Sequence, residues 1–152
     1  MNAVRRGAAV AQRYLVSLYV LGVVVQFFLV GWGLFGMNKG DTVQDAKSLD
    51  PHRGFGWIFT QLGGLLLLLA TLIAWQRPRG RRVGLYVLLC LLGFPVQPLL
   101  AGGGEHHQWV GMLHPVNAML LLGLSGYLAH RAWTTDRGAE RAPEAAPAAA
   151  AR

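Results

Sequence analysis

Residues 55–75 read FGWIFTQLGGLLLLLATLIAW and contain no charged side chain. A helix needs about 20 mostly apolar residues to cross the hydrocarbon core of a bilayer, so this stretch is long enough to span a membrane. Three more stretches of similar character lie at residues 14–35, 83–100 and 109–133. Since backbone polar groups inside a bilayer must be paired within the protein, the sequence predicts an all-α integral membrane four-helix bundle.

The four stretches occupy most of the 152 residues. We expect residues 1–12 to form a cytoplasmic N-terminal tail, residues 13–134 to form the four-helix transmembrane domain, and residues 135–152 to form a disordered cytoplasmic tail rich in Ala and Pro. The fourth helix begins either at Trp109, with a kink, or at Pro115.

Two loop features are also predicted. Asp50 followed by Pro51 is typical of an N-cap and a first helical position. The segment AGGGEHHQ, residues 101–108, is expected to be a flexible outer connection because it is rich in glycine.

The net charge of +7 is explained by topology rather than by nucleic acid. In a four-span arrangement only Lys39, Lys47 and Arg53 fall on one side of the membrane. The other basic residues fall on the opposite side, which the positive-inside rule assigns to the cytoplasm together with both termini of a bacterial plasma-membrane protein. These residues are Arg5, Arg6, Arg13, Arg77, Arg79, Arg81, Arg82, Arg131, Arg137, Arg141 and Arg152.

An internal repeat relates the two halves of the chain. The segment VQFFLVGWG, residues 25–33, aligns with VQPLLAGGG, residues 96–104, and each is followed by a loop and then by a histidine next to a proline. Two hairpins of the same direction predict a pseudo-twofold axis along the membrane normal. The aligned pairs are Gln26 with Gln97, Gly31 with Gly102, and His52 with His114.

The repeat places His52 and His114 at one depth near the outer face, at the start of helices two and four. Neutral imidazoles from facing helices are the usual axial ligands of haem in a helical bundle. The sequence therefore predicts a bis-histidine site for haem b. The alternative is that each histidine is only a polar anchor at the membrane interface.

Four further polar residues are assigned to the same site. Arg53 either pairs with a haem propionate or extends to lipid phosphate. Gln26 and Gln97 either contact the ligand or hydrogen-bond across helices as packing contacts. Asn117 lies one turn after His114 and either orients its ring or caps the helix.

Other candidates for chemistry are weaker. Cys90 is the only cysteine, which excludes an internal disulfide or a CxxC redox pair. Residues 105–107, Glu-His-His, lie in a glycine-rich loop with no cluster to complete a metal site. His130 has no second histidine at its end of the bundle and is read as a cation at a helix C-terminus.

The motifs VQFFLVGWGLFG, LDPHRGFGW and GMLHPVNAMLLLG resemble a family of small bacterial four-helix membrane proteins of unknown function, over about residues 14–133. The glutamines, the His52-Arg53 pair and His114 are also similar to one four-helix half of haem A synthase. That resemblance implies that His52 and His114 would be the axial pair. The synthase has a glutamate where this chain has Leu49, and it has an outer-loop cysteine pair that this chain lacks, so a haem-modifying catalytic role is not expected.

The expected function is thus a b-type haem protein that transfers electrons or handles haem, with the lipid bilayer and a membrane redox partner or a second copy as its partners. The alternative is a non-catalytic membrane subunit or scaffold without a cofactor.

Overall fold

The computed structural model describes residues 3–37, 47–74 and 80–140, and their regular structure is helical. The first rod is the single helix α1 (Ala3–Phe35), and the second joins α3 (Asp50–Ile58), the π-helix η1 (Phe59–Gly63) and α4 (Gly64–Ala74). The third joins α5 (Gly80–Leu91), the π-helix η2 (Leu92–Val96) and α6 (Gln97–Gly104), and the fourth is α7 (Gln108–Glu140).

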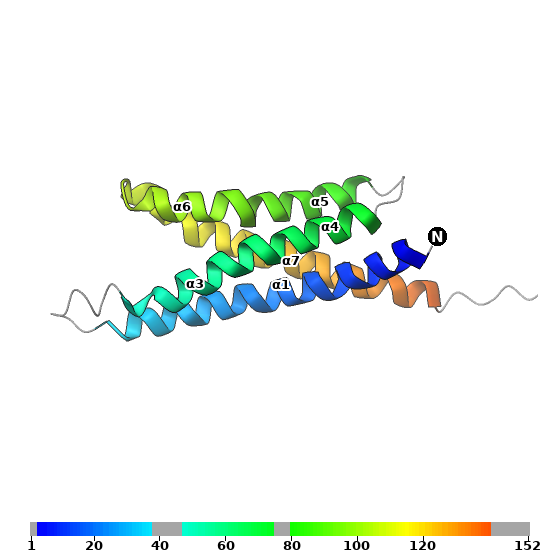
Figure 1. Ribbon diagram of the computed structural model, residues 1–152, viewed down its shortest axis with the longest axis horizontal. Coiled ribbons are helices and arrows are strands. Elements are labelled where there is room, and N and C mark those ends of the chain that lie inside the picture. The colour runs from blue at the N-terminus through cyan, green and yellow to red at the C-terminus, as the bar shows by residue number, and fades with distance from the viewer. Residues whose placement is uncertain (1–2, 38–46, 75–79, 141–152) are drawn as a thin grey trace, which may run out of the picture.

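Each of the four rods contains a segment long and apolar enough to cross a membrane, namely Ala3–Phe35, Asp50–Ala74, Arg82–Gly104 and Gln108–Thr134. The rods run up and down, so that the beginning of α1 and the end of α7 lie at the same end of the bundle (Figure 1). The expected all-α fold with four membrane-length helices is therefore confirmed.

The helix ends differ from the expected boundaries. α1 begins at Ala3, so most of the expected N-terminal tail is helical, and α7 extends to Glu140, six residues into the expected C-terminal tail. α7 begins at Gln108, which decides for a fourth helix that starts near Trp109 and contains Pro115. Residues 1–2, 38–46, 75–79 and 141–152 lie outside the described part of the chain.

Two loop predictions were wrong. The N-cap of α3 is Leu49, with no side-chain cap, and Asp50 is the first residue of the helix. The segment at residues 101–108 is not a flexible connection, because its glycines continue α6 as far as Gly104. The turn is closed by backbone hydrogen bonds, among them His107 N–H to the Gly103 carbonyl at 2.9 Å.

Both π-helices lie in the middle of a rod. η2 contains Pro95, which has no backbone N–H and therefore disturbs the regular helical ladder. In η2 the Leu92 carbonyl accepts from the N–H of Gln97, five residues later, as a π-turn requires. Asn117 on the neighbouring helix α7 gives the same carbonyl a second donor, at 2.9 Å.

The buried core lies between α1, α4, α5 and α7, and it packs these four helices against one another. Its side chains are mostly large and apolar, and Leu67 and Leu89 are completely buried. The core residues are Val16, Tyr19, Val23, Leu67, Tyr86, Leu89, Cys90, Leu121 and Leu128.

Beyond the core the two hairpins separate. α3 packs against α1, and α6 packs against α7. In Figure 1 the α6 end diverges from the end formed by α1 and α3. The space between these two pairs of helices holds the candidate site.

Candidate functional site

A cavity of about 610 Å³ lies between the two hairpins, on the side of the core where α3 and α6 lie. Cavities of roughly 300–1,000 Å³ are typical of sites for cofactors and small ligands. All four rods contribute to its lining, and several lining positions have small side chains, including Gly56, Gly102, Gly111 and Ala118. At Gly102 an added Cβ would meet no neighbour within 4 Å.

His52 and His114 both line this cavity and face each other across it. Their ring centroids are 6.2 Å apart, and the ring planes are inclined by 79°. Both side chains are half-buried. The structure therefore brings together the two histidines that the sequence pairs.

His114 is held in one tautomer by Gln97. The Gln97 side-chain amide donates to His114 Nε2 at 3.3 Å and to the His114 carbonyl at 3.3 Å. Because Nε2 accepts, Nδ1 carries the proton and donates to the Gln97 backbone carbonyl at 3.1 Å. Metal-ligating histidines usually donate their second ring nitrogen in this way.

Asn117 fixes Gln97 in turn. It is 4% exposed, and it donates to the Gln97 side-chain oxygen at 2.6 Å as well as to the Leu92 carbonyl. Of the two expected roles for Asn117, orienting the histidine ring through Gln97 agrees with these contacts. Helix capping does not, because Asn117 lies well inside α7.

Gln26 contacts His52 as Gln97 contacts His114. The amide orientation that satisfies every group donates to His52 Nδ1 at 2.8 Å and to the His52 carbonyl at 3.2 Å, and it accepts from the Gly56 N–H at 2.8 Å. In each hairpin a glutamine amide thus contacts both the ring and the backbone carbonyl of the following histidine. For His52, however, Nδ1 is the acceptor, so its neutral ring carries the proton on Nε2.

Charged side chains lie at the edge of the cavity. Arg53 on α3 and Glu105 after α6 both contribute to the lining. The Arg53 guanidinium is 3.6 Å from the Asp50 carboxylate, and both side chains are more than half exposed. An exposed pair of this kind contributes about 0–1 kcal/mol, so an anionic group at the cavity edge would compete with Asp50 for Arg53.

The lining also contains residues that were not among the predicted site residues, including Tyr19, Phe59 and Gly56. Tyr19 is 2% exposed, and its ring packs against that of Phe59 at 4.8 Å, at the end of the cavity nearest the core. No local pattern distinguishes either ring from an ordinary core aromatic. Gly56 was detectable, since both histidines are followed one turn later by a small residue, Gly56 or Ala118.

The donor set fits two axial ligands rather than a many-ligand metal site. Among residues 3–37, 47–74 and 80–140, no group of three or more His, Cys, Asp or Glu side chains could hold a metal ion. Two metal–nitrogen bonds of about 2 Å put facing ring nitrogens about 4 Å apart, and therefore imidazole centroids about 6 Å apart. The centroid separation of 6.2 Å between His52 and His114 agrees with this spacing, while both ring nitrogens of His114 contact Gln97.

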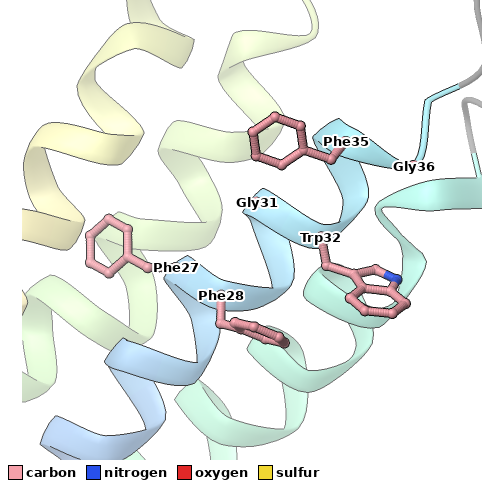
Figure 2. A pocket seen from close by; sticks show the side chains of 6 residues that line it. All are labelled: Phe27, Phe28, Gly31, Trp32, Phe35 and Gly36. Atoms are coloured by element: carbon pink, nitrogen blue, oxygen red, sulfur yellow. The ribbon is translucent and has the colours of Figure 1, made fainter.

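A second, more open groove lies on the C-terminal part of α1. Figure 2 shows Phe27 and Phe35 projecting to one side of the helix and Phe28 and Trp32 to the other, with Gly31 between them. The lining carries no titratable side chain. Phe28, Trp32 and Phe35 are largely exposed, as expected of a helix face that meets acyl chains.

Comparison with protein-family models, with curated proteins and with solved structures finds no match for this chain. The resemblances to a bacterial membrane family and to haem A synthase therefore stay predictions.

Proposed function

We propose that the chain is a multi-pass protein of the bacterial plasma membrane that holds one b-type haem between His52 and His114, for electron transfer or haem handling. The observation that carries this proposal is the 6.2 Å separation of the two imidazoles inside a cavity formed by all four rods. When bound, haem b would supply a one-electron redox centre.

The residues of the chain have distinct roles in this proposal. His114 is positioned by Gln97 with Nδ1 as donor, so that Nε2 is the nitrogen available to iron. The Gln97 amide must then give up its contact with Nε2 and keep its contact with the His114 carbonyl, both of which are 3.3 Å long. Arg53 at the cavity edge would exchange Asp50 for a propionate.

The proposed topology has both termini in the cytoplasm and the cavity near the outer face. It rests on the distribution of arginine, and exposed Arg5, Arg6 and Arg131 lie at the same end of the bundle. The equivalent contacts of Gln26 with His52 and of Gln97 with His114 support a pseudo-twofold relation between the hairpins.

A second candidate is the non-catalytic membrane subunit. The aromatic groove on α1 favours it, because Phe28 and Trp32 would be available to a partner helix. In this case the histidines would serve only to fasten helices through the two glutamines. The two candidates differ in whether the purified protein is coloured.

The test is a reduced-minus-oxidised absorption spectrum of protein that is purified in detergent after expression with ample haem. We expect a b-type spectrum from the wild type and loss of its bis-histidine form in His52→Ala and in His114→Ala. Matched controls are His106→Ala and His107→Ala, which change exposed histidines at the turn between α6 and α7. A colourless wild type would refute the haem proposal.

Electron paramagnetic resonance gives a sharper form of the same test. Nearly perpendicular axial imidazole planes produce a low-spin ferric signal with one large g value, whereas parallel planes produce a rhombic signal with three moderate g values. Because the His52 and His114 planes are inclined by 79°, we expect the first kind of signal. A rhombic signal would contradict the observed ring arrangement as the ligating one.

A further inference from the structure

The two histidines of the cavity are held unequally. His114 lies within the 33-residue helix α7, and its ring bonds both the side chain and the backbone of Gln97. His52 lies at the third position of α3, where the rod Asp50–Ala74 begins, and α3 has no side-chain N-cap and no buried residue. The His52 ring also bonds the side chain and the backbone of Gln26. The backbone of His114 is therefore held more firmly than that of His52.

The residues that hold the two glutamine side chains also differ between the hairpins. Asn117, three residues after His114, fixes the Gln97 amide with a 2.6 Å hydrogen bond. The position three residues after His52 is Phe55, which has no amide and stacks on Phe59 instead. The Gln26 side-chain oxygen accepts instead from the backbone N–H of Gly56 at 2.8 Å, on the same helix α3 as His52.

The tautomers also differ. His114 carries its proton on Nδ1, and its Nε2 lone pair accepts from the Gln97 amide, so ligation through Nε2 would break one contact of 3.3 Å. His52 carries its proton on Nε2, because Nδ1 accepts from Gln26. For His52 to bind through Nε2, that proton must leave and another must be taken up at Nδ1.

This change at His52 also requires the Gln26 amide to rotate, so that its oxygen can accept from Nδ1–H. Rotation would bring the amide NH₂ against the Gly56 N–H, donor against donor, and the amide oxygen against the His52 carbonyl, acceptor against acceptor. Polar groups left in such contacts lose their hydrogen bonds without replacement. Ligation by His52 therefore competes with three hydrogen bonds of Gln26, whereas ligation by His114 breaks one contact of the Gln97 amide and keeps the donation of its Nδ1.

We infer that His114 is the fixed axial ligand and that His52 is a releasable one, with Gln26 as the positioning residue that favours its release. The inference rests on the proposed haem site and assigns it a further property, which is that a small exogenous ligand enters on the His52 side. A site of this kind can bind a diatomic ligand or pass haem on, in addition to carrying electrons.

Carbon monoxide is the probe, added to the dithionite-reduced, haem-loaded full chain. We expect CO to take the position that His52 Nε2 leaves, giving a shifted Soret band in the wild type. His52→Ala should keep its haem with His114 as the single protein ligand, with a high-spin spectrum and at least tenfold tighter CO binding. His114→Ala should lose haem during purification.

Gln26→Glu tests the tautomer argument directly. A carboxylate accepts from both the His52 Nδ1–H and the Gly56 N–H, which favours the ligating tautomer. We expect CO binding roughly tenfold weaker than in the wild type, the factor that 1.4 kcal/mol represents. Gln61→Glu is the matched control, because Gln61 lies on η1 and does not line the cavity, and it should leave CO binding unchanged.

The outcomes separate this inference from the function on which it rests. A wild type without a haem spectrum refutes the proposed function. A normal bis-histidine spectrum with no CO adduct, or haem retained by His114→Ala and lost by His52→Ala, overturns the inference alone. An equal loss of CO affinity in Gln26→Glu and Gln61→Glu removes the role of Gln26.

Discussion

The ring of His52 differs from that of His114 in the direction of one hydrogen bond, since Nδ1 accepts in the first and donates in the second. The sequence predicted both histidines and both glutamines because polar groups inside apolar stretches are rare and must meet partners. It could not predict the tautomers. These depend on which atom of each amide faces the ring, and only the surrounding backbone decides that.

Gly56 controls the orientation of Gln26, because a Cβ at this position would collide with the end of the Gln26 amide, whose oxygen accepts from the Gly56 N–H. We expect Gly56→Ala to displace the amide and release His52 Nδ1. In haem-free protein, ¹⁵N NMR should show His52 mainly as the Nε2–H tautomer in the wild type and as a mixture in Gly56→Ala. Gly54→Ala is the control, since an added Cβ there meets nothing within 4 Å, and an unchanged His52 in Gly56→Ala would contradict the prediction.

Asn117 is the buried residue on which the His114 side of the site depends. Asn117→Leu removes both of its hydrogen bonds and leaves the Gln97 side-chain oxygen without its donor. We expect a loss of about 1–3 kcal/mol in the free energy of unfolding, measured by denaturant titration in detergent. Ser125→Ala is the control, because Ser125 is also buried in α7 but donates to the Leu122 carbonyl of its own helix. If Ser125→Ala lowers the free energy of unfolding as much as Asn117→Leu does, Asn117 has no special role.

At the scale of elements, the number of helices could be predicted and their internal irregularities could not. The length of an apolar stretch is sufficient to detect a membrane-spanning helix. The alternation of basic and less basic loops then predicts the direction in which each of the four helices runs. The π-helices η1 and η2 could not be predicted from the apolar pattern, because each adds only one residue to a single helical turn. The glycines of residues 101–108 were misread as a loop because close helix contact also favours glycine.

The turn between α6 and α7 depends on close backbone contact between Gly104 and Gly111. An added Cβ at Gly104 would lie 2.7 Å from the Gly111 Cα, and backbone atoms cannot move aside as a flexible side chain can. We expect Gly104→Ala to push the two helices apart and to cost about 1–3 kcal/mol of unfolding free energy. Gly102→Ala, which meets no neighbour within 4 Å, should be neutral or slightly stabilising, and equal effects of the two variants would refute the close-contact explanation.

For the whole molecule, the arrangement follows from packing four apolar rods over only part of their length. The core holds α1, α4, α5 and α7 together, and the two hairpins are left to separate beyond it. The cavity is the consequence of that separation, which is why it lies at one end of the bundle rather than at its centre. Its lining combines residues far apart in the sequence, so only the histidines, the glutamines and Arg53 could be expected there.

The same separation gives the molecule a direction that can be measured. If the arginine-rich end faces the cytoplasm, the cavity end faces outward.

Cys90 is 5% exposed and can be changed to Ala to give a cysteine-free background. In that background an impermeant maleimide added to intact cells should label Glu105→Cys at the outer turn, whereas Arg6→Cys on α1 should react only after the membrane is opened. Both positions are exposed, so accessibility within the fold does not bias the comparison. Labelling of Arg6→Cys alone in intact cells would invert the topology and place the haem site at the cytoplasmic face.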